Sequence, residues 1–147
     1  MDYQIDDLTA EALDEVIALW QATEGVGLSE GDTKDDLVAF LARNPGLSLV
    51  ARHDGRIVGA VLSGHDGRRG CLYHLAVATP YRHQGIGRTL VETCVQRLAS
   101  FGIRKCNIFL YNHNKIGQRF WNRNGWKERT DLKILQTVTS SPSLLDK

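Results

Sequence analysis

Apolar residues recur along this chain with two different spacings, and the shorter spacing predicts strands. An alternation of apolar and polar positions between turn residues favours half-buried β-structure. Asp54-Gly55 favours a tight hairpin turn between two such segments, and a second turn at 65–70 leads into the next segment. Strands are therefore predicted at 3–7, 47–53, 56–63, 71–77 and 105–111.

Four other segments carry apolar residues three and four positions apart, which places these residues on one face of a helix. Thr9, Thr33 and Asn114 are suitable N-cap residues for three of the helices, and the remaining helix follows a glycine turn. The apolar faces span 12–20, 37–41, 86–99 and 116–121. Residues 25–32, rich in helix breakers, form a loop between the first two helices that is well placed to act as a lid.

The order of these elements predicts an α/β fold. A hairpin meander followed by crossovers through helices builds a mixed sheet. Residues 126–138 alternate only weakly, so no strand is assigned to them. We expect a single domain at 1–138, followed by a frayed tail at 139–147.

The composition is that of an ordinary globular protein with one buried core: 147 residues, of which 42% are hydrophobic and 24% charged. No apolar stretch reaches the about 18 residues that a membrane span needs, and the N-terminus lacks the pattern of a secretory signal. We therefore expect a cytoplasmic protein with no membrane partner. The three cysteines are widely spaced and form no Cys-x-x-Cys pair, which argues against a disulfide framework and against a metal site.

Charge is unevenly distributed along the chain, although the net charge is only +1. Residues 1–40 hold eleven of the seventeen acidic residues and one base, whereas the rest of the chain is basic. The basic part suits a polyanionic ligand and the acidic part a cationic one, but solvated surface explains both equally well. The bases are scattered and no nucleic-acid motif accompanies them, so no nucleic-acid partner is expected.

The run Arg82-His83-Gln84-Gly85-Ile86-Gly87-Arg88 follows the predicted strand at 71–77 and opens into the long third helix. Two glycines one residue apart allow close backbone approach, and a turn at a helix start directs free N–H groups at an anion. The run therefore predicts a phosphate-binding turn, with a plain tight turn as the alternative. A dinucleotide fingerprint needs a third glycine where Leu90 stands, and the P-loop pattern Gly-x-x-x-x-Gly-Lys-Ser/Thr does not occur.

Three segments, taken in order, resemble the GNAT superfamily of N-acetyltransferases, which transfer an acetyl group from acetyl-CoA to an amine. They are Leu75-Ala76-Val77 at a strand end, Arg82-x-x-Gly85-x-Gly87, and Asn114 followed by Phe120-Trp121-x-x-x-Gly125-Trp126. The resemblance covers roughly residues 3–136. It implies a mostly antiparallel central sheet with helices on both faces, and strands that splay apart at the CoA site.

The resemblance also implies how acetyl-CoA, as cosubstrate and without a metal, is held. The backbone of Leu75 and Val77 would pair with the pantetheine amides like an added strand, and the amides of residues 83–88 would receive the pyrophosphate. The guanidinium groups of Arg82 and Arg88 add positive charge. Asn114 would contact the cofactor, although a role as helix N-cap is equally compatible with its position. The implied cofactor residues are Leu75, Ala76, Val77, Arg82, His83, Gln84, Gly85, Ile86, Gly87, Arg88 and Asn114.

Catalysis requires a neutral amine to attack the thioester, so a base or a water chain is needed for an alkyl ammonium. The candidate residues are Tyr73, His74, Glu24 and Asp66. We rank Tyr73 first, as a residue that orders a water chain, with a role as a core aromatic as the alternative. Strict alternation along the strand would point His74 to the opposite face. The backbone N–H of Val77 is the expected oxyanion donor.

One position departs from the family pattern. Many members carry a tyrosine on the last helix that protonates the leaving thiolate, and this chain has Trp121 there. Tyr111 could replace that acid, or no acid is needed because a thiol with a pKa of about 8.5 already leaves readily. The departure also leaves room for a CoA-binding regulatory module with little turnover.

The expected reaction is direct acetyl transfer to a small-molecule amine or a peptide N-terminus. The acceptor would enter by the loop at 23–32, where Glu24, Glu30 and Asp32 favour a cation. A homodimer is a possible assembly.

Overall fold

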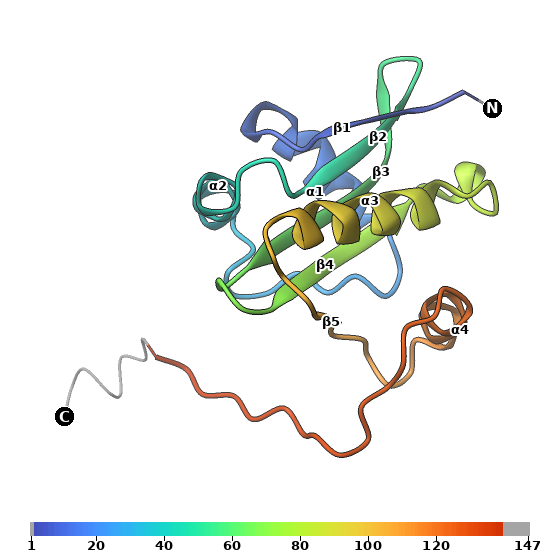
Figure 1. The fold of residues 1–147 in the computed structure, drawn as a ribbon. Coiled ribbons are helices and arrows are strands. Elements are labelled where there is room, and N and C mark those ends of the chain that lie inside the picture. Colours follow the sequence, from blue (N-terminus) through green and yellow to red (C-terminus); the bar gives the residue numbers. More distant parts are fainter. Residues whose placement is uncertain (1, 140–147) are drawn as a thin grey trace.

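A five-stranded sheet forms the centre of the molecule, in the strand order β1-β2-β3-β4-β5. The structure, a computed structural model, describes residues 2–139, so the predicted tail lies outside the described residues except for Thr139. Neighbouring strands from β1 to β4 are antiparallel, whereas β5 runs parallel to β4 (Figure 1). The strands are β1 (Gln4–Asp7), β2 (Leu49–His53), β3 (Arg56–His65), β4 (Gly70–Val77) and β5 (Cys106–Ile108).

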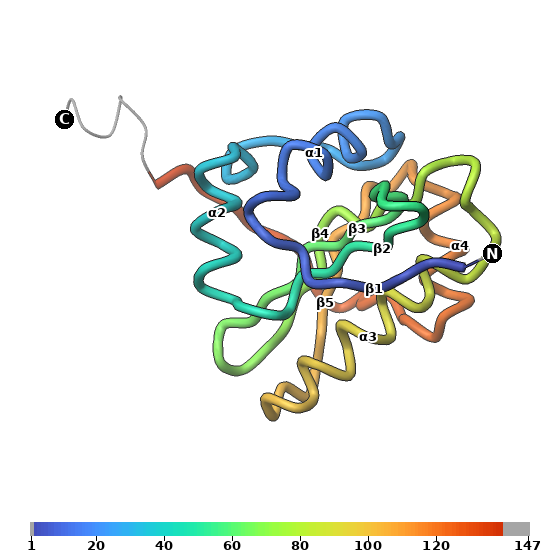
Figure 2. Tube along the Cα trace, turned by 90° about the horizontal axis from the view of Figure 1, so that it is seen from above, coloured from blue at the N-terminus to red at the C-terminus, as the bar shows by residue number. Residues whose placement is uncertain are grey.

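Helices cover both faces of this sheet. They are α1 (Leu13–Gln21), α2 (Lys34–Arg43), α3 (Ile86–Ser100) and α4 (Lys115–Arg123), with short 3-10 turns η1 (Ala10–Ala12) and η2 (Thr79–Tyr81). Figure 2 shows α1 and α3 on opposite sides of the sheet. The mixed, mostly antiparallel fold with helices on both faces is confirmed.

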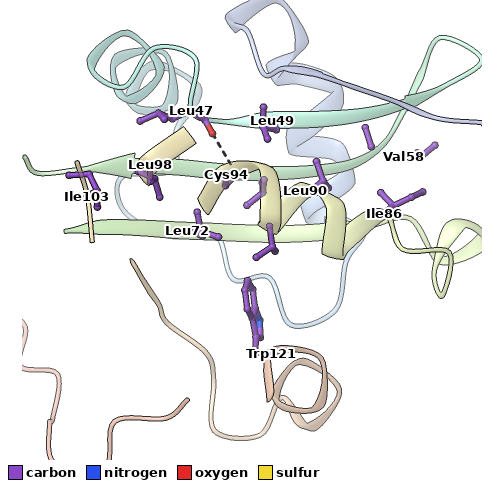
Figure 3. Close-up of a cluster of buried hydrophobic side chains, with 13 residues drawn as sticks. Leu47, Leu49, Val58, Leu72, Ile86, Leu90, Cys94, Leu98, Ile103 and Trp121 are labelled. Atoms are coloured by element: carbon purple, nitrogen blue, oxygen red, sulfur yellow. Dashed lines mark hydrogen bonds between the residues drawn. The ribbon is translucent and has the colours of Figure 1, made fainter. Parts of the chain in front are cut away.

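Two apolar clusters form the core, one on each face of the sheet. On one face, α3 packs over the strands through Ile86, Leu90 and Leu98, and Trp121 reaches this cluster from α4 (Figure 3). The buried Cys94 thiol belongs to it and donates to the Leu47 carbonyl at 3.6 Å. On the other face, the fully buried Trp20 of α1 lies in the second cluster. The α3 cluster therefore joins the sheet to α4.

Local signals in the sequence account for several element boundaries. The Thr33 hydroxyl accepts a hydrogen bond from the Asp36 N–H at 3.1 Å and so caps α2. The β2–β3 turn has Asp54 at φ 50° and Gly55 at φ 76°, the two positive values that a tight hairpin turn of this kind requires. Both predictions are confirmed because each depends only on neighbouring residues.

One predicted strand is shorter than expected, and the weakly alternating segment after α4 forms none. β5 ends at Ile108, three residues before the predicted end, and the side chains of Phe109 and Tyr111 are exposed. Residues 126–138 form no strand, and Leu135 is 92% exposed (red in Figure 1). Alternation produces a strand only where a neighbouring strand supplies hydrogen-bond partners, and neither segment has such a neighbour in the described structure.

Within residues 2–139, no helix is long and apolar enough to cross a membrane. The same part of the chain contains no group of three His, Cys, Asp or Glu side chains that could hold a metal ion.

Candidate functional site

The edge of β4 is open over most of its length. β5 pairs with β4 only at Gly70, Cys71 and Leu72, so residues 73–77 have no β5 partner. The other edge of β4 is occupied by β3. An open strand edge presents backbone N–H and C=O groups to which an extended ligand can add as another strand. The open edge of β4 (residues 73–77) is therefore one wall of the candidate site.

The turn between β4 and α3 supplies a set of free donors. No acceptor is recorded within residues 2–139 for the backbone N–H groups of residues 83–88. His83 and Gly85 have positive φ values of 62° and 84°, and both residues are exposed. Gly85 is the N-cap of α3, so the positive end of the helix dipole lies at the same place. This turn, called the cradle below (residues 82–88), can bind an anion such as a phosphate.

The two glycines of the cradle have different environments. A side-chain carbon on Gly85 would meet nothing within 4 Å, so lack of space does not require glycine at this position. The positive φ does require it, because glycine adopts such a φ without steric cost. A side-chain carbon on Gly87 would lie 3.3 Å from Cε1 of Phe120 and 3.6 Å from Cγ2 of Val77. Gly87 is buried and allows α3 to approach α4 and the end of β4 closely.

The two arginines of the cradle have partners of different kinds. Nε of Arg82 donates to the Val77 carbonyl at 3.0 Å, which fastens the turn to the end of β4. Nε of Arg88 donates to the Glu92 carboxylate at 2.8 Å on the exposed side of α3. This hydrogen bond raises the pKa of the Arg88 guanidinium and offsets part of its charge.

The segment between β5 and α4 meets the loop that joins α1 to α2. Asn114 caps α4 by accepting from the Gly117 N–H at 2.9 Å, and its Nδ2 would lie 2.8 Å from a side-chain carbon on Gly25. A side-chain carbon on Gly27 would overlap the Tyr111 hydroxyl. Both glycines are needed for this close approach. The α1–α2 loop (residues 22–33) thus lies against the N-terminal end of α4.

A bulge in β4 reverses the expected direction of one side chain. The register with β3 shifts between Leu62↔Tyr73 and Ala60↔Ala76, and His74 within the shift has φ 57°. Tyr73 packs with the α1-side cluster, and the His74 ring centroid lies 5.0 Å from that of Trp20 in the same cluster. The expectation that alternation points His74 away from Tyr73 is wrong, because the extra residue of the bulge interrupts the alternation.

His74 is hydrogen-bonded to the α1–α2 loop. Its Nε2 lies 2.9 Å from Oδ1 of Asp32, and the two side chains are only 15% and 14% exposed. The other oxygen, Oδ2, accepts from the Ser29 N–H at 3.0 Å. The sequence marks Asp32 as one acidic residue among several in the loop, but pairing across 42 positions leaves no local signal.

The remaining candidate bases are less well placed. Tyr73 lies between Phe40 and Phe109, and burial raises the pKa of its hydroxyl well above the ordinary value. Asp66 lies in the β3–β4 turn, at the end of β4 far from Val77, where the N–H groups of residues 68 and 69 hydrogen-bond to it and lower its pKa. Glu24 is exposed in the α1–α2 loop.

Trp121 is a core residue. Its side chain is 8% exposed and packs edge-on against Trp126, with the ring centroids 4.9 Å apart. Trp121 cannot donate a proton to a leaving thiolate as a tyrosine hydroxyl at this position would, because an indole N–H does not act as an acid. A separate surface hollow is lined by Val91, Glu92, Val95, Gln96, Asn124 and Trp126 and contains none of the predicted site residues.

Comparisons with known proteins agree on one family. A family model described as the acetyltransferase (GNAT) family matches residues 13–126. An acetyltransferase of Sodalis glossinidius (strain morsitans) is 34% identical over 101 residues, which are 69% of this chain and 70% of the relative. An acetyltransferase of Yersinia pseudotuberculosis serotype I is 35% identical over 112 residues, which are 76% of this chain and 75% of the relative.

Solved structures share the fold at lower identity. The paiA N-acetyltransferase from Thermoplasma acidophilum, in complex with coenzyme A, has a TM-score of 0.74 at 24% identity and covers 86% of this chain and 91% of its own. AAC(6')-Iy, in complex with a bisubstrate analog, has a TM-score of 0.75 at 16% identity and covers 94% and 99%.

Proposed function

Because the chain belongs to the acetyltransferase (GNAT) family and is an acyltransferase, we propose that it transfers the acetyl group of acetyl-CoA directly to a primary amine. The proposal covers a small-molecule amine or a peptide N-terminus as acceptor. Two solved structures with this fold hold coenzyme A, and others are aminoglycoside acetyltransferases. These proteins support the cosubstrate and the amine class, and the identity of the acceptor here is part of the proposal.

The observation that carries the proposal is the meeting of two sets of free backbone groups. The open edge of β4 ends at Val77, and the unpaired amides of the cradle begin six residues later at His83. Arg82 holds the two together through the Val77 carbonyl. CoA has a chain of amides followed by a pyrophosphate, so one molecule can use both sets.

The roles follow from this arrangement. Leu75, Ala76 and Val77 pair with the pantetheine arm, while the cradle amides and Arg82 hold the pyrophosphate. The N–H of Val77 stabilises negative charge on the thioester oxygen as the amine attacks. The acidic α1–α2 loop, with Glu24 exposed, receives a cationic acceptor.

The test is acetyl-CoA-dependent release of thiol across a panel of primary amines, with melting temperature measured with and without CoA. Gln84→Glu adds a carboxylate at an exposed position in the cradle, so we expect CoA affinity to fall about tenfold or more. Gln96→Glu makes the same change at an exposed position within α3, away from the cradle, and should leave CoA affinity unchanged.

Equal CoA stabilisation of the two variants would contradict the cradle assignment. Stabilisation by CoA without thiol release from any amine would leave the cofactor site intact and remove the transfer reaction. The chain would then be a CoA-binding module of low turnover, which is the alternative that Trp121 suggests.

A further inference from the structure

His74 is held in an unusual backbone conformation at the centre of β4. A φ of 57° is uncommon for a residue with a side chain, and it costs on the order of 1 kcal/mol. Such strain persists only where the surrounding structure holds it, and strained residues gather at functional sites. Here the bulge places the imidazole on the α1 side of the open edge, three residues before Val77.

The surroundings of the imidazole fix its orientation. Oδ1 of Asp32 lies 2.9 Å from Nε2, and the ring lies beside the fully buried Trp20. Asp32 is itself held, because its second oxygen accepts from the Ser29 N–H. Among residues 2–139, the recorded neighbours of the ring are Asp32 from the loop, Trp20 from α1 and Tyr73 on β4, and Asp32 is the only carboxyl group among them.

This arrangement determines which ring nitrogen is available. A carboxylate at Nε2 favours the tautomer whose hydrogen is on Nε2, and the neutral ring then has its lone pair on Nδ1. No partner for Nδ1 is recorded in the described part of the chain. An imidazole oriented by a carboxylate, with its second nitrogen free, is the arrangement of a general base.

We propose that Nδ1 of His74 accepts the proton of the acceptor ammonium and that Asp32 is the positioning residue that holds the base. The inference rests on the proposed function and assigns the base of that reaction. His74 takes the place of Tyr73, which the sequence ranks first for ordering a water chain and which packs between Phe40 and Phe109. It also takes the place of Asp66, which lies at the other end of β4. The hydrogen bond between His74 and Asp32 also ties the α1–α2 loop to β4.

The proton balance of the step is complete. The ammonium gives one proton to Nδ1, directly or through one water, and the neutral amine nitrogen forms a bond to the thioester carbon. The carbon–sulfur bond breaks and its electron pair goes to sulfur, which takes the second proton from nitrogen. The third stays on the amide, and the imidazolium, stabilised by Asp32, returns its proton to water.

The backbone conformation of His74 suggests the variant to use. Asparagine tolerates a positive φ better than most residues, so His74→Asn removes the base with little added strain. We expect kcat to fall about 100-fold or more, with the CoA-induced rise in melting temperature unchanged. His74→Gly also fits this φ, and added imidazole should restore part of its activity.

Asp32→Asn tests orientation separately from binding. The Ser29 N–H requires an oxygen at its position, so the amide NH2 of the asparagine faces Nε2 and favours the opposite tautomer, with hydrogen on Nδ1. We expect kcat to fall about tenfold or more without loss of CoA binding. Histidine 15N spectra should show the change of tautomer. Asp35→Asn removes a charge from an exposed position in the first turn of α2 and is the matched control.

Each result decides the proposal. A loss of kcat in both variants, imidazole rescue of His74→Gly and a tautomer change in Asp32→Asn support it. If His74→Asn keeps kcat within threefold while the wild type turns over, the base is elsewhere and the proposed function stands. Loss without rescue and without tautomer change assigns a structural role and overturns the proposal. A wild type inactive with every amine overturns the proposed function, and this proposal with it.

Discussion

Gly85 and Gly87 belong to one short motif, yet the structure gives them different reasons to be glycine. Gly85 has φ 84° and open space around it, whereas Gly87 lies against Phe120. The sequence assigns both to close approach of a ligand. Only the packing of α4 on α3 separates a conformational requirement from a steric one.

A double-mutant cycle with Phe120→Leu distinguishes these requirements. Gly85→Ala should lower the free energy of unfolding by about 1 kcal/mol whether residue 120 is Phe or Leu, because its penalty comes from φ. The effect of Gly87→Ala on the free energy of unfolding should be about 1 kcal/mol more favourable in the Phe120→Leu protein than in the wild type, because the contact with Cε1 of Phe120 is relieved. Urea unfolding of the variants measures both values. A zero coupling between positions 87 and 120 would contradict the steric assignment.

Tyr73 and His74 show the limit of prediction for single residues. The types of both residues made them candidates from the sequence, and the strand was predicted at nearly its observed bounds. The bulge that turns both side chains to one face depends on the register between β3 and β4. Alternation within one strand contains no information about that register.

At the scale of the secondary-structure element, Asn114 has one predicted role that is confirmed and one that stays a prediction. Its role as N-cap of α4 was one of two predicted roles and is confirmed by the hydrogen bond from Gly117. Its contact with the cofactor stays a prediction. The amide NH2 faces Gly25 of the α1–α2 loop, so the side chain also serves the contact between two elements.

Substitutions at Asn114 separate the cap from the cofactor role. Asn114→Ala should lower stability by about 1 kcal/mol, whereas Asn114→Asp keeps the acceptor for Gly117 and should retain stability. Asn112→Ala, two residues before the cap and exposed, is the control. Thermal unfolding measures these effects. If both Asn114 variants also weaken CoA binding, the contact with the cofactor is supported. If Asn114→Ala is as stable as the wild type, the cap does not stabilise the protein.

At the scale of the whole molecule, packing extends as far as Trp126, which contacts Trp121. Beyond it, the segment after α4 carries apolar side chains that are exposed in the described chain. They are Leu132, Ile134, Leu135 and Val138. The domain at 1–138, the homodimer, the cytoplasmic location and the absence of nucleic-acid partners stay predictions.

Removal of residues 131–147 should change the melting temperature by no more than about 2 °C, because the described part of this segment, residues 131–139, buries little apolar surface. Trp126→Ala should lower the free energy of unfolding by about 2 kcal/mol, since it removes packing against Trp121. Calorimetry measures the stability of the truncated protein and of Trp126→Ala, and sedimentation measures their state of assembly. A large loss of stability on truncation would mean that the segment packs in solution and belongs to the domain.

Features that depend on residues close in sequence could be predicted: helix faces from apolar spacing, the caps at Thr33 and Asn114, the turn at Asp54-Gly55 and the glycine turn before α3. These follow from backbone geometry over a few positions. The length of β5, the packing of Phe120 on Gly87 and the pairing of His74 with Asp32 became visible only in the folded chain. Each joins groups far apart in sequence, and such contacts exist only once the sheet register and helix packing are set.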